Sequence, residues 1–238
     1  MSPAQILSVI IPAYNEERTI AAVVERVLAV PLPGWEKEII VVDDGSRDET
    51  RARVRQFLGA IRLLAHEENQ GKGAAIRTGI AAASGDAVII QDADMEYDPA
   101  DWPAMLAAFE EGEGAVIYGS RELQPDRRGY PHYVAGVKML TAFNNMLFRS
   151  RLTDIYTCYK LFPASLIKAL PLASTGFEFE AEVTGALLRR GFRIREVPIR
   201  YAPRTFADGK KIRFRDGVIG IRTIFVQRFF SHNNHLIK

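Results

Sequence analysis

In the first 120 residues, continuous apolar runs alternate with stretches whose apolar residues recur at helical spacing. The runs predict strands at residues 6–12, 38–44, 61–66, 86–94 and 114–121. The stretches between them predict helices at residues 16–30, 48–58, 71–84 and 99–112. Strands that are apolar throughout are typical of a parallel sheet covered on both faces. The order therefore predicts an α/β fold, with a Rossmann-like, mostly parallel sheet and helices on both faces.

The second half of the chain has a less regular pattern. It predicts helices at residues 131–149, 176–191 and 214–230, a loop leading into a short strand at 152–163, and a strand at 192–204. Neither an internal repeat nor a low-complexity linker interrupts it. We therefore expect one domain over residues 1–212 and a C-terminal amphipathic helical extension over residues 213–238, packed on that domain or on a membrane.

Charge is distributed unevenly along the chain, although the net charge is only +2. Residues 186–238 hold 13 Lys and Arg against 3 Asp and Glu, which leaves 18 basic and 26 acidic residues in the rest. A basic amphipathic helix at the C-terminus favours an anionic partner such as a membrane surface. The alternative is an ordinary helix that packs on the sheet or on a second subunit, as in a homodimer.

Composition places the chain among cytoplasmic proteins. Hydrophobic residues make up 47% of it, and the single cysteine, Cys158, excludes a disulfide framework. The N-terminus lacks the features of a signal peptide, and no apolar run approaches the roughly 20 residues needed to cross a bilayer. We expect a cytoplasmic protein, or one that is peripheral on the cytoplasmic face of a membrane.

Acidic residues gather where the fourth predicted strand ends, at Asp92, Asp94, Glu96 and Asp98. In an extended chain the first three share one side, where they repel one another unless a cation or protons neutralise them. Carboxylate oxygens select Mg²⁺ or Mn²⁺, which also binds substrate phosphates. We therefore predict a divalent ion that bridges these three residues to a phosphorylated ligand. The alternative is an acidic loop before the next helix, which Asp98 would cap.

Two further segments lie at strand ends on the same predicted edge of the sheet, where α/β proteins bind ligands. Asp43 and Asp44 end the second strand, and such an acid can accept a bond from a ribose hydroxyl or a base. A turn and helix cap is the alternative. The glycines of residues 69–73 allow the backbone to approach a ligand beside Lys72, although the spacing is not that of a Walker motif.

These segments resemble a known family. The stretches that carry the resemblance are SVIIPAYNEERTI (8–20), EIIVVDDGSRDET (38–50), ENQGKGAAIRTGI (68–80) and DAD (92–94). In this order they resemble the inverting family 2 glycosyltransferases of the GT-A fold. Residues 119–121, 152–160, 177–182 and 203–212 extend the match toward the branch of dolichyl-phosphate mannose synthase and its bacterial polyprenyl-phosphate relatives. Residues 127–138 depart from the pattern of that branch.

The resemblance implies a role for each matching position. The expected nucleotide-binding residues are Pro12, Ala13, Tyr14, Glu16, Asp43, Lys72 and Asp92. Asp92, Asp94 and Glu96 would bind Mg²⁺ or Mn²⁺ with the donor diphosphate. The expected phosphate- and acceptor-binding residues are Arg121, Arg204, Lys210 and Lys211.

The implied reaction is a single displacement that moves a hexose from GDP-mannose or UDP-glucose to a polyprenyl or dolichyl phosphate. Asp94 and Arg121 would act in catalysis. A phosphate acceptor is already ionised, whereas a hydroxyl acceptor needs a base, for which Asp154 and Glu178 are the candidates.

Other functions remain open. They are transfer to a hydroxyl of a soluble or cell-envelope glycan, nucleotidyl transfer, and nucleotide binding without catalysis. The acidic edge argues against a nucleic-acid partner, which needs a continuous basic track.

Overall fold

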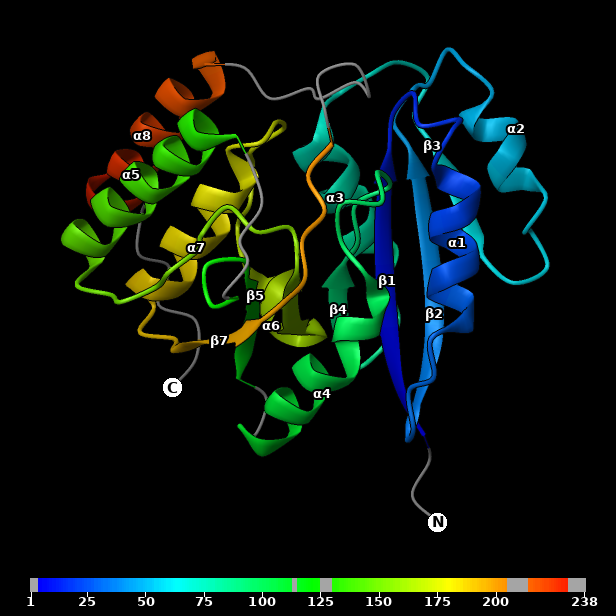
Figure 1. Ribbon diagram of the computed structural model, residues 1–238, viewed down its shortest axis with the longest axis horizontal. Helices are drawn as coiled ribbons and strands as arrows, with labels where there is room; N and C mark the ends of the chain where they lie inside the picture. Colours follow the sequence, from blue (N-terminus) through cyan, green and yellow to red (C-terminus); the bar gives the residue numbers. More distant parts are fainter. Residues whose placement is uncertain (1–3, 113–114, 125–129, 205–213, 231–238) are drawn as a thin grey trace.

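The computed structural model describes residues 4–112, 115–124, 130–204 and 214–230 (Figure 1). Within them, seven strands form one sheet in the order β3-β2-β1-β4-β6-β5-β7. The strands are β1 (Gln5–Ala13), β2 (Trp35–Asp43), β3 (Arg62–Ala65), β4 (Ala87–Ile90), β5 (Val116–Ser120), β6 (Lys160–Pro163) and β7 (Ile194–Pro198). Neighbouring strands are parallel, except that β6 runs antiparallel to both β4 and β5. The predicted mostly parallel α/β sheet is confirmed.

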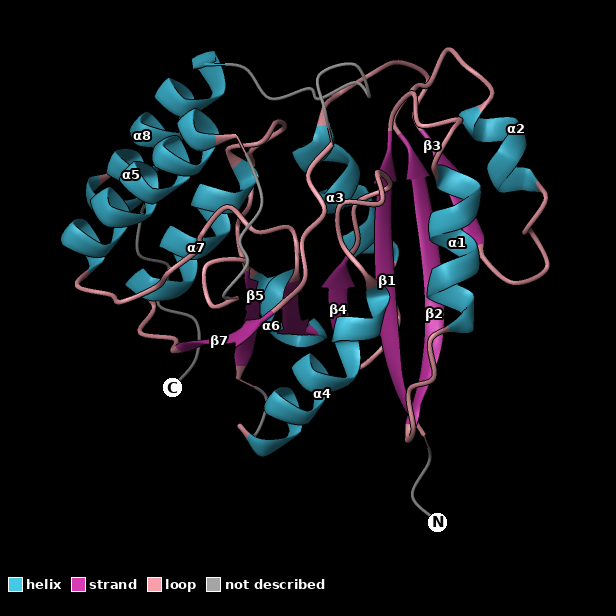
Figure 2. Ribbon diagram, in the orientation of Figure 1, coloured by secondary structure: helices cyan, strands magenta, loops and turns pink. Residues whose placement is uncertain are grey.

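Helices flank the sheet on both faces (Figure 2). They are α1 (Ile20–Ala29), α2 (Thr50–Arg55), α3 (Lys72–Ala82), the 3-10 helix η1 (Pro99–Asp101), α4 (Trp102–Glu111), α5 (Pro131–Phe148), α6 (Ala164–Ala169), α7 (Phe179–Arg189) and α8 (Phe214–Phe229). The central strand β4 is buried at every position, which explains why its sequence is apolar rather than alternating. Gly79 of α3 lies directly over Ile10 of β1, so that the helix approaches the sheet closely.

Two predicted strands are shorter in the structure. The strand expected over residues 86–94 ends at Ile90, and the one expected over 192–204 ends at Pro198. After Ile90 the chain turns, and Met95 adopts a positive φ of 63°. The acidic residues that follow β4 therefore lie on a turn and not on an extended strand.

The C-terminal helix α8 packs on α5 and α7 (Figure 1). A small second core holds the three together, with Leu140, Leu152, Ile155, Ala181 and Ile224 buried in it. The described part of the predicted C-terminal extension, α8, therefore packs on the domain, which was one of the two predicted arrangements. Among the described helices, none is both long and apolar enough to cross a membrane.

Candidate active site

One cavity of about 830 Å³ opens where β1, β2 and β4 end. Ten predicted site residues line it: Pro12, Ala13, Tyr14, Glu16, Lys72, Asp92, Asp94, Glu96, Arg121 and Arg204. Asp43 and Asp154 are fully buried and are not among the lining residues. Lys210 and Lys211 lie outside the described residues. The fold therefore brings together residues that are almost 200 positions apart in the chain.

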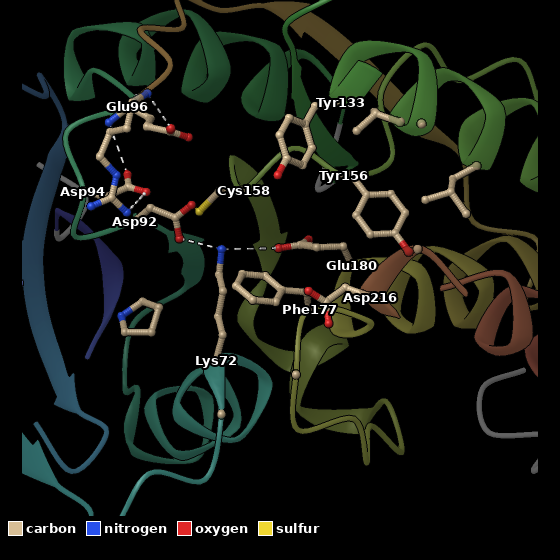
Figure 3. A pocket seen from close by; sticks show the side chains of 18 of the residues that line it. Lys72, Asp92, Asp94, Glu96, Tyr133, Tyr156, Cys158, Phe177, Glu180 and Asp216 are labelled. Atoms are coloured by element: carbon tan, nitrogen blue, oxygen red, sulfur yellow. Dashed lines mark hydrogen bonds and ion pairs between the residues drawn. The ribbon is translucent and has the colours of Figure 1, made fainter. Parts of the chain in front are cut away.

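Two acidic residues of the turn after β4 are each paired with a cation. Lys72, at the start of α3, places its Nζ 2.6 Å from Oδ1 of Asp92 (Figure 3). Arg204 reaches over the turn, with its Nη2 2.9 Å from Oδ2 of Asp94. The same guanidinium binds Glu16, Nη1 to Oε2, at 2.9 Å. In this state, basic side chains neutralise the acidic edge of the sheet.

Glu96 does not join these two carboxylates. It accepts a hydrogen bond from the Tyr201 hydroxyl at 2.6 Å and another from the backbone N–H of Arg204 at 2.7 Å. Within the described part of the chain, no three acidic, histidine or cysteine side chains form a group that could hold a metal ion by themselves. Among the described residues the three carboxylates therefore do not form one ligand group, because Tyr201 and the backbone of Arg204 hold Glu96, and Glu96 as a metal ligand stays a prediction.

The electrostatics of the remaining pair still fit a divalent ion. Burial, and then the nearby carboxylates of Asp92 and Glu96, raise the pKa of Asp94 to about 7. Burial is the largest single influence on Asp92 and acts to raise its pKa, but the charge and hydrogen bond of Lys72, the hydrogen bond of Cys158 and the charge of Arg204 together lower the pKa. Mg²⁺ is typically bound by one or two carboxylates together with substrate phosphates. Asp92 and Asp94 could hold such an ion once a diphosphate supplies further oxygens.

Asp154 lies behind Arg121, and the two form a double ion pair. Its carboxylate accepts from Nε at 2.6 Å and from Nη2 at 2.9 Å. Burial is the largest single influence on Asp154 and acts to raise its pKa, but the charge of Arg121, its hydrogen bonds and the charge of Lys160 together lower the pKa. A fully buried carboxylate with both oxygens bound cannot reach an acceptor hydroxyl. The role of general base predicted for Asp154 is corrected to one of holding Arg121.

The other candidate base, Glu178, also has a structural role. Its Oε1 accepts from the backbone N–H groups of Thr175 and Gly176, at 3.2 Å and 2.9 Å, in the turn before α7. Glu178 is not among the residues that line the cavity. This agrees with the alternative that it caps its helix.

The two acidic residues at the end of β2, Asp43 and Asp44, differ in their position relative to the cavity. Asp43 points away from the cavity and accepts from Nε of Arg51 at 2.6 Å. Asp44 lines the cavity, and it accepts from the backbone N–H groups of Gln70 and Gly71 at 2.9 Å and 2.8 Å. The nucleotide-binding role predicted for Asp43 is therefore not supported by its position. Asp44 instead fixes the loop that leads into α3.

Sequence reasoning missed Glu180, which lines the cavity from α7. Its Oε2 is bound by Nζ of Lys160, a lysine at the start of β6 with no exposed surface. The lysine also donates to the carbonyl of Thr157 and lies 4.7 Å from the ring centre of Tyr118. A lysine at the head of the apolar run KLFP was the available signal, because a buried lysine requires an anionic partner.

An acidic pair at the end of a central strand, facing basic side chains across a cavity in a mostly parallel α/β sheet, defines a GT-A type nucleotide-sugar site. The sequence model of the family described as glycosyl transferase family 2 matches residues 8–170, and the chain belongs to this family.

Curated relatives include polyprenyl-phosphate enzymes. The dodecaprenyl-phosphate galacturonate synthase of Rhizobium johnstonii is 33% identical over 176 residues, which are 70% of this chain and 50% of that protein. The low-salt glycan biosynthesis hexosyltransferase Agl6 of Haloferax volcanii is 30% identical over 222 residues, 89% of this chain and 53% of that protein. This chain spans about half the length of both relatives.

Solved structures share the fold. The glucosyl-3-phosphoglycerate synthase of Mycobacterium tuberculosis, crystallised with Mn²⁺, UDP and glucosyl-3-phosphoglycerate, superposes with a TM-score of 0.73 at 21% identity, over 97% of this chain and 82% of that one. Its complex with phosphoglyceric acid gives a TM-score of 0.74 at 23% identity, over 96% and 81%. At this identity the likeness concerns the fold.

Proposed function

We propose that this glycosyltransferase moves a hexose from a nucleotide sugar, GDP-mannose or UDP-glucose, to a polyprenyl phosphate. The observation that carries the proposal is that one cavity joins charged residues near the end of β4 to apolar side chains of α5 and α8. The charged residues are Lys72, Asp92 and Asp94, and the apolar ones include Val137 and Leu140 of α5, which line the cavity together with the polar Tyr156 and the charged Arg215 and Asp216. A ligand with an anionic head and a hydrocarbon chain could contact both groups. The relative from Rhizobium johnstonii described above, a dodecaprenyl-phosphate enzyme by name, supports this acceptor class.

The donor would lie along the edge of the sheet. Pro12, Ala13 and Tyr14 line the cavity beside Asp44, where a nucleoside fits. When bound, Mg²⁺ or Mn²⁺ would stabilise the negative charge that develops on the leaving diphosphate. Asp92 and Asp94 would hold that ion.

Lys72 and Arg204 would contribute from the protein side. Both are already in the cavity, and their ion pairs with carboxylates keep them in place before the donor binds. Preorganised cations of this kind stabilise a developing anion at little reorganisation cost.

The acceptor phosphate would bind Arg121. Two of its guanidinium nitrogens, Nε and Nη2, are used by Asp154, which leaves Nη1 outside that pair. The ring of Tyr201, 4.9 Å from the guanidinium carbon, packs against it from another side. Because Asp154 and Glu178 are both engaged, the site favours an acceptor that is already ionised over one with a hydroxyl.

We further propose that α5 and α8 rest on a membrane that carries the acceptor. Large apolar side chains on this surface are exposed: Met139, Met146, Val218, Ile221, Phe225, Val226 and Phe229. Arg215, Arg222 and Arg228 are exposed on α8 among them. Near an anionic surface each basic residue contributes about 1 kcal/mol. The proposed location is peripheral, on the cytoplasmic face.

The direct test is a screen of nucleotide sugars for hydrolysis and transfer, with Mn²⁺, in the presence and absence of farnesyl phosphate. We expect transfer to the lipid phosphate from GDP-mannose or from UDP-glucose. Transfer to soluble glycans alone would favour a hydroxyl acceptor. If no nucleotide sugar is turned over or bound, the proposal is wrong.

A further inference from the structure

Four residues of alternating charge form a row from the edge of the cavity into the core, and Figure 3 shows the first three, Asp92, Lys72 and Glu180. Asp92 lies 2.6 Å from Nζ of Lys72, and that Nζ lies 3.9 Å from Oε1 of Glu180. Oε2 of Glu180 is bound to Lys160. The row joins the turn after β4, the start of α3, α7 and β6, so that four separate elements meet in it.

The inner end of the row cannot move. Lys160 has no exposed surface, and it is bound to Glu180 and to the carbonyl of Thr157. This fixes one carboxylate oxygen of Glu180. The other oxygen, Oε1, is buried and has no hydrogen-bond partner among the described residues. A buried acceptor without a bond is costly, and Nζ of Lys72 lies 3.9 Å from it, just beyond hydrogen-bond distance.

The outer end of the row must change when the site is loaded. In the structure Lys72 occupies Oδ1 of Asp92, which is one of the two carboxylates proposed to hold the divalent ion. A divalent ion on Asp92 would repel Lys72 and would weaken the ion pair between the lysine and this carboxylate. A shift of about 1 Å would bring its Nζ within hydrogen-bond distance of Glu180, as the 3.9 Å separation shows.

We infer that Glu180 is a positioning residue that receives Lys72 when a divalent cation binds Asp92. Lys72 then changes its partner from Asp92 to Glu180, so that the ion can bind Asp92 while the lysine keeps an anionic partner. This inference rests on the proposed function, because it requires the divalent ion at Asp92 and Asp94.

A double-mutant cycle on Mn²⁺ binding tests this change of partner by Lys72. The dissociation constant of Mn²⁺ would be measured in the presence of saturating UDP, by the loss of the free-ion electron paramagnetic resonance signal relative to a reference with UDP and no protein. Glu180→Gln should raise this constant about tenfold, within the range of couplings between contacting charges, because Lys72 then lacks an anionic partner to move to. In a Lys72→Met background, the same substitution should change it less than about twofold.

Glu182→Gln is the matched control. Glu182 is buried on the same helix, but its carboxylate binds the backbone N–H groups of Ala173 and Ser174 and not the side chain of Lys72. Its substitution should leave the Mn²⁺ constant unchanged. If Glu180→Gln changes the Mn²⁺ dissociation constant equally with and without Lys72, or does not change it, the inference is wrong.

A crystal of the wild-type protein soaked in Mn²⁺ and UDP gives a second test that needs no variant to fold. Nζ of Lys72 should lie within hydrogen-bond distance of Oε1 of Glu180 and away from Asp92. A lysine that stays on Asp92 beside the bound ion would overturn the inference. If the wild-type protein binds no Mn²⁺ in the presence of UDP or GDP, the metal dependence in the proposed function is itself wrong, and the inference goes with it.

Discussion

At the scale of single residues, Asp154 and Arg121 act as one unit, in which both oxygens of the carboxylate hold the guanidinium. We predict that Asp154→Asn raises the KM for the acceptor about tenfold or more and leaves donor binding intact, because Arg121 loses its orientation. Removing one partner of a buried ion pair should also cost about 3 kcal/mol of stability. Steady-state kinetics and thermal unfolding check both effects.

The split between KM and kcat separates positioning from base catalysis. If Asp154 were the base, its substitution would lower kcat and leave the KM for the acceptor unchanged. Glu178→Gln, which alters a carboxylate outside the cavity, is the control and should keep both values.

The second prediction concerns Asp94 as a ligand of the proposed metal ion. Asp94→Ala should lower kcat/KM by about a hundredfold or more, because the proposed ion loses one of its two carboxylates. The matched control is Asp98→Ala, in the same acidic run. Asp98 accepts from the backbone N–H of Ala100 at 3.0 Å and caps η1, so its loss should cost about 1 kcal/mol of stability while activity stays. Normal turnover by Asp94→Ala would exclude the assigned metal site.

The sequence predicted individual site residues best where their role depends on a strand end. Asp92, Asp94, Tyr14 and Lys72 line the cavity because a parallel sheet gathers its strand ends at one edge. Glu180 was missed, since the buried Lys160 signals an anionic partner but not which one, and that partner is 20 positions away on another element.

At the scale of elements, the entry into α3 places Lys72 in the cavity. Gly71 has a φ of 101°, and a Cβ there would strike the backbone carbonyl of Thr175. We predict that Gly71→Ala costs about 2 kcal/mol of stability and weakens nucleotide binding, because the loop and the start of α3 must shift. Thermal unfolding and calorimetry with UDP and GDP would measure both. Gly59→Ala, where no atom lies within 4 Å of the added carbon, should change neither.

The periodicity of the sequence identified most elements and fixed few of their ends. Apolar runs predicted β1, β2 and β4, but Asp94 accepts a bond from the N–H of Glu96, and this local turn ends the extended region early. The antiparallel direction of β6 had no sequence signal. A four-residue strand after a long loop can pair in either direction, and its contacts with β4 and β5 decide.

At the scale of the whole molecule, the acidic edge of the sheet and the basic, apolar surface of α5 and α8 open onto the same cavity. In the proposed location, a lipid phosphate that lies in a membrane would meet Arg121 first, and the donor would reach the edge of the sheet from the aqueous side. Membrane binding would give the surface of α5 and α8 a function beyond packing.

Phe225 and Phe229 offer the sharpest test of that surface, because they are 45% and 56% exposed and their rings lie 4.8 Å apart on α8. Phe225→Glu with Phe229→Glu should abolish flotation with vesicles that contain anionic lipid, since it removes apolar area and adds two repelling charges. Transfer to soluble farnesyl phosphate should continue, because neither residue lines the cavity. Leu58→Glu, at a side chain 55% exposed just beyond α2, controls for the loss of an exposed apolar residue and should float normally. Unchanged flotation by the double variant would mean that α8 packs on the domain without a membrane role.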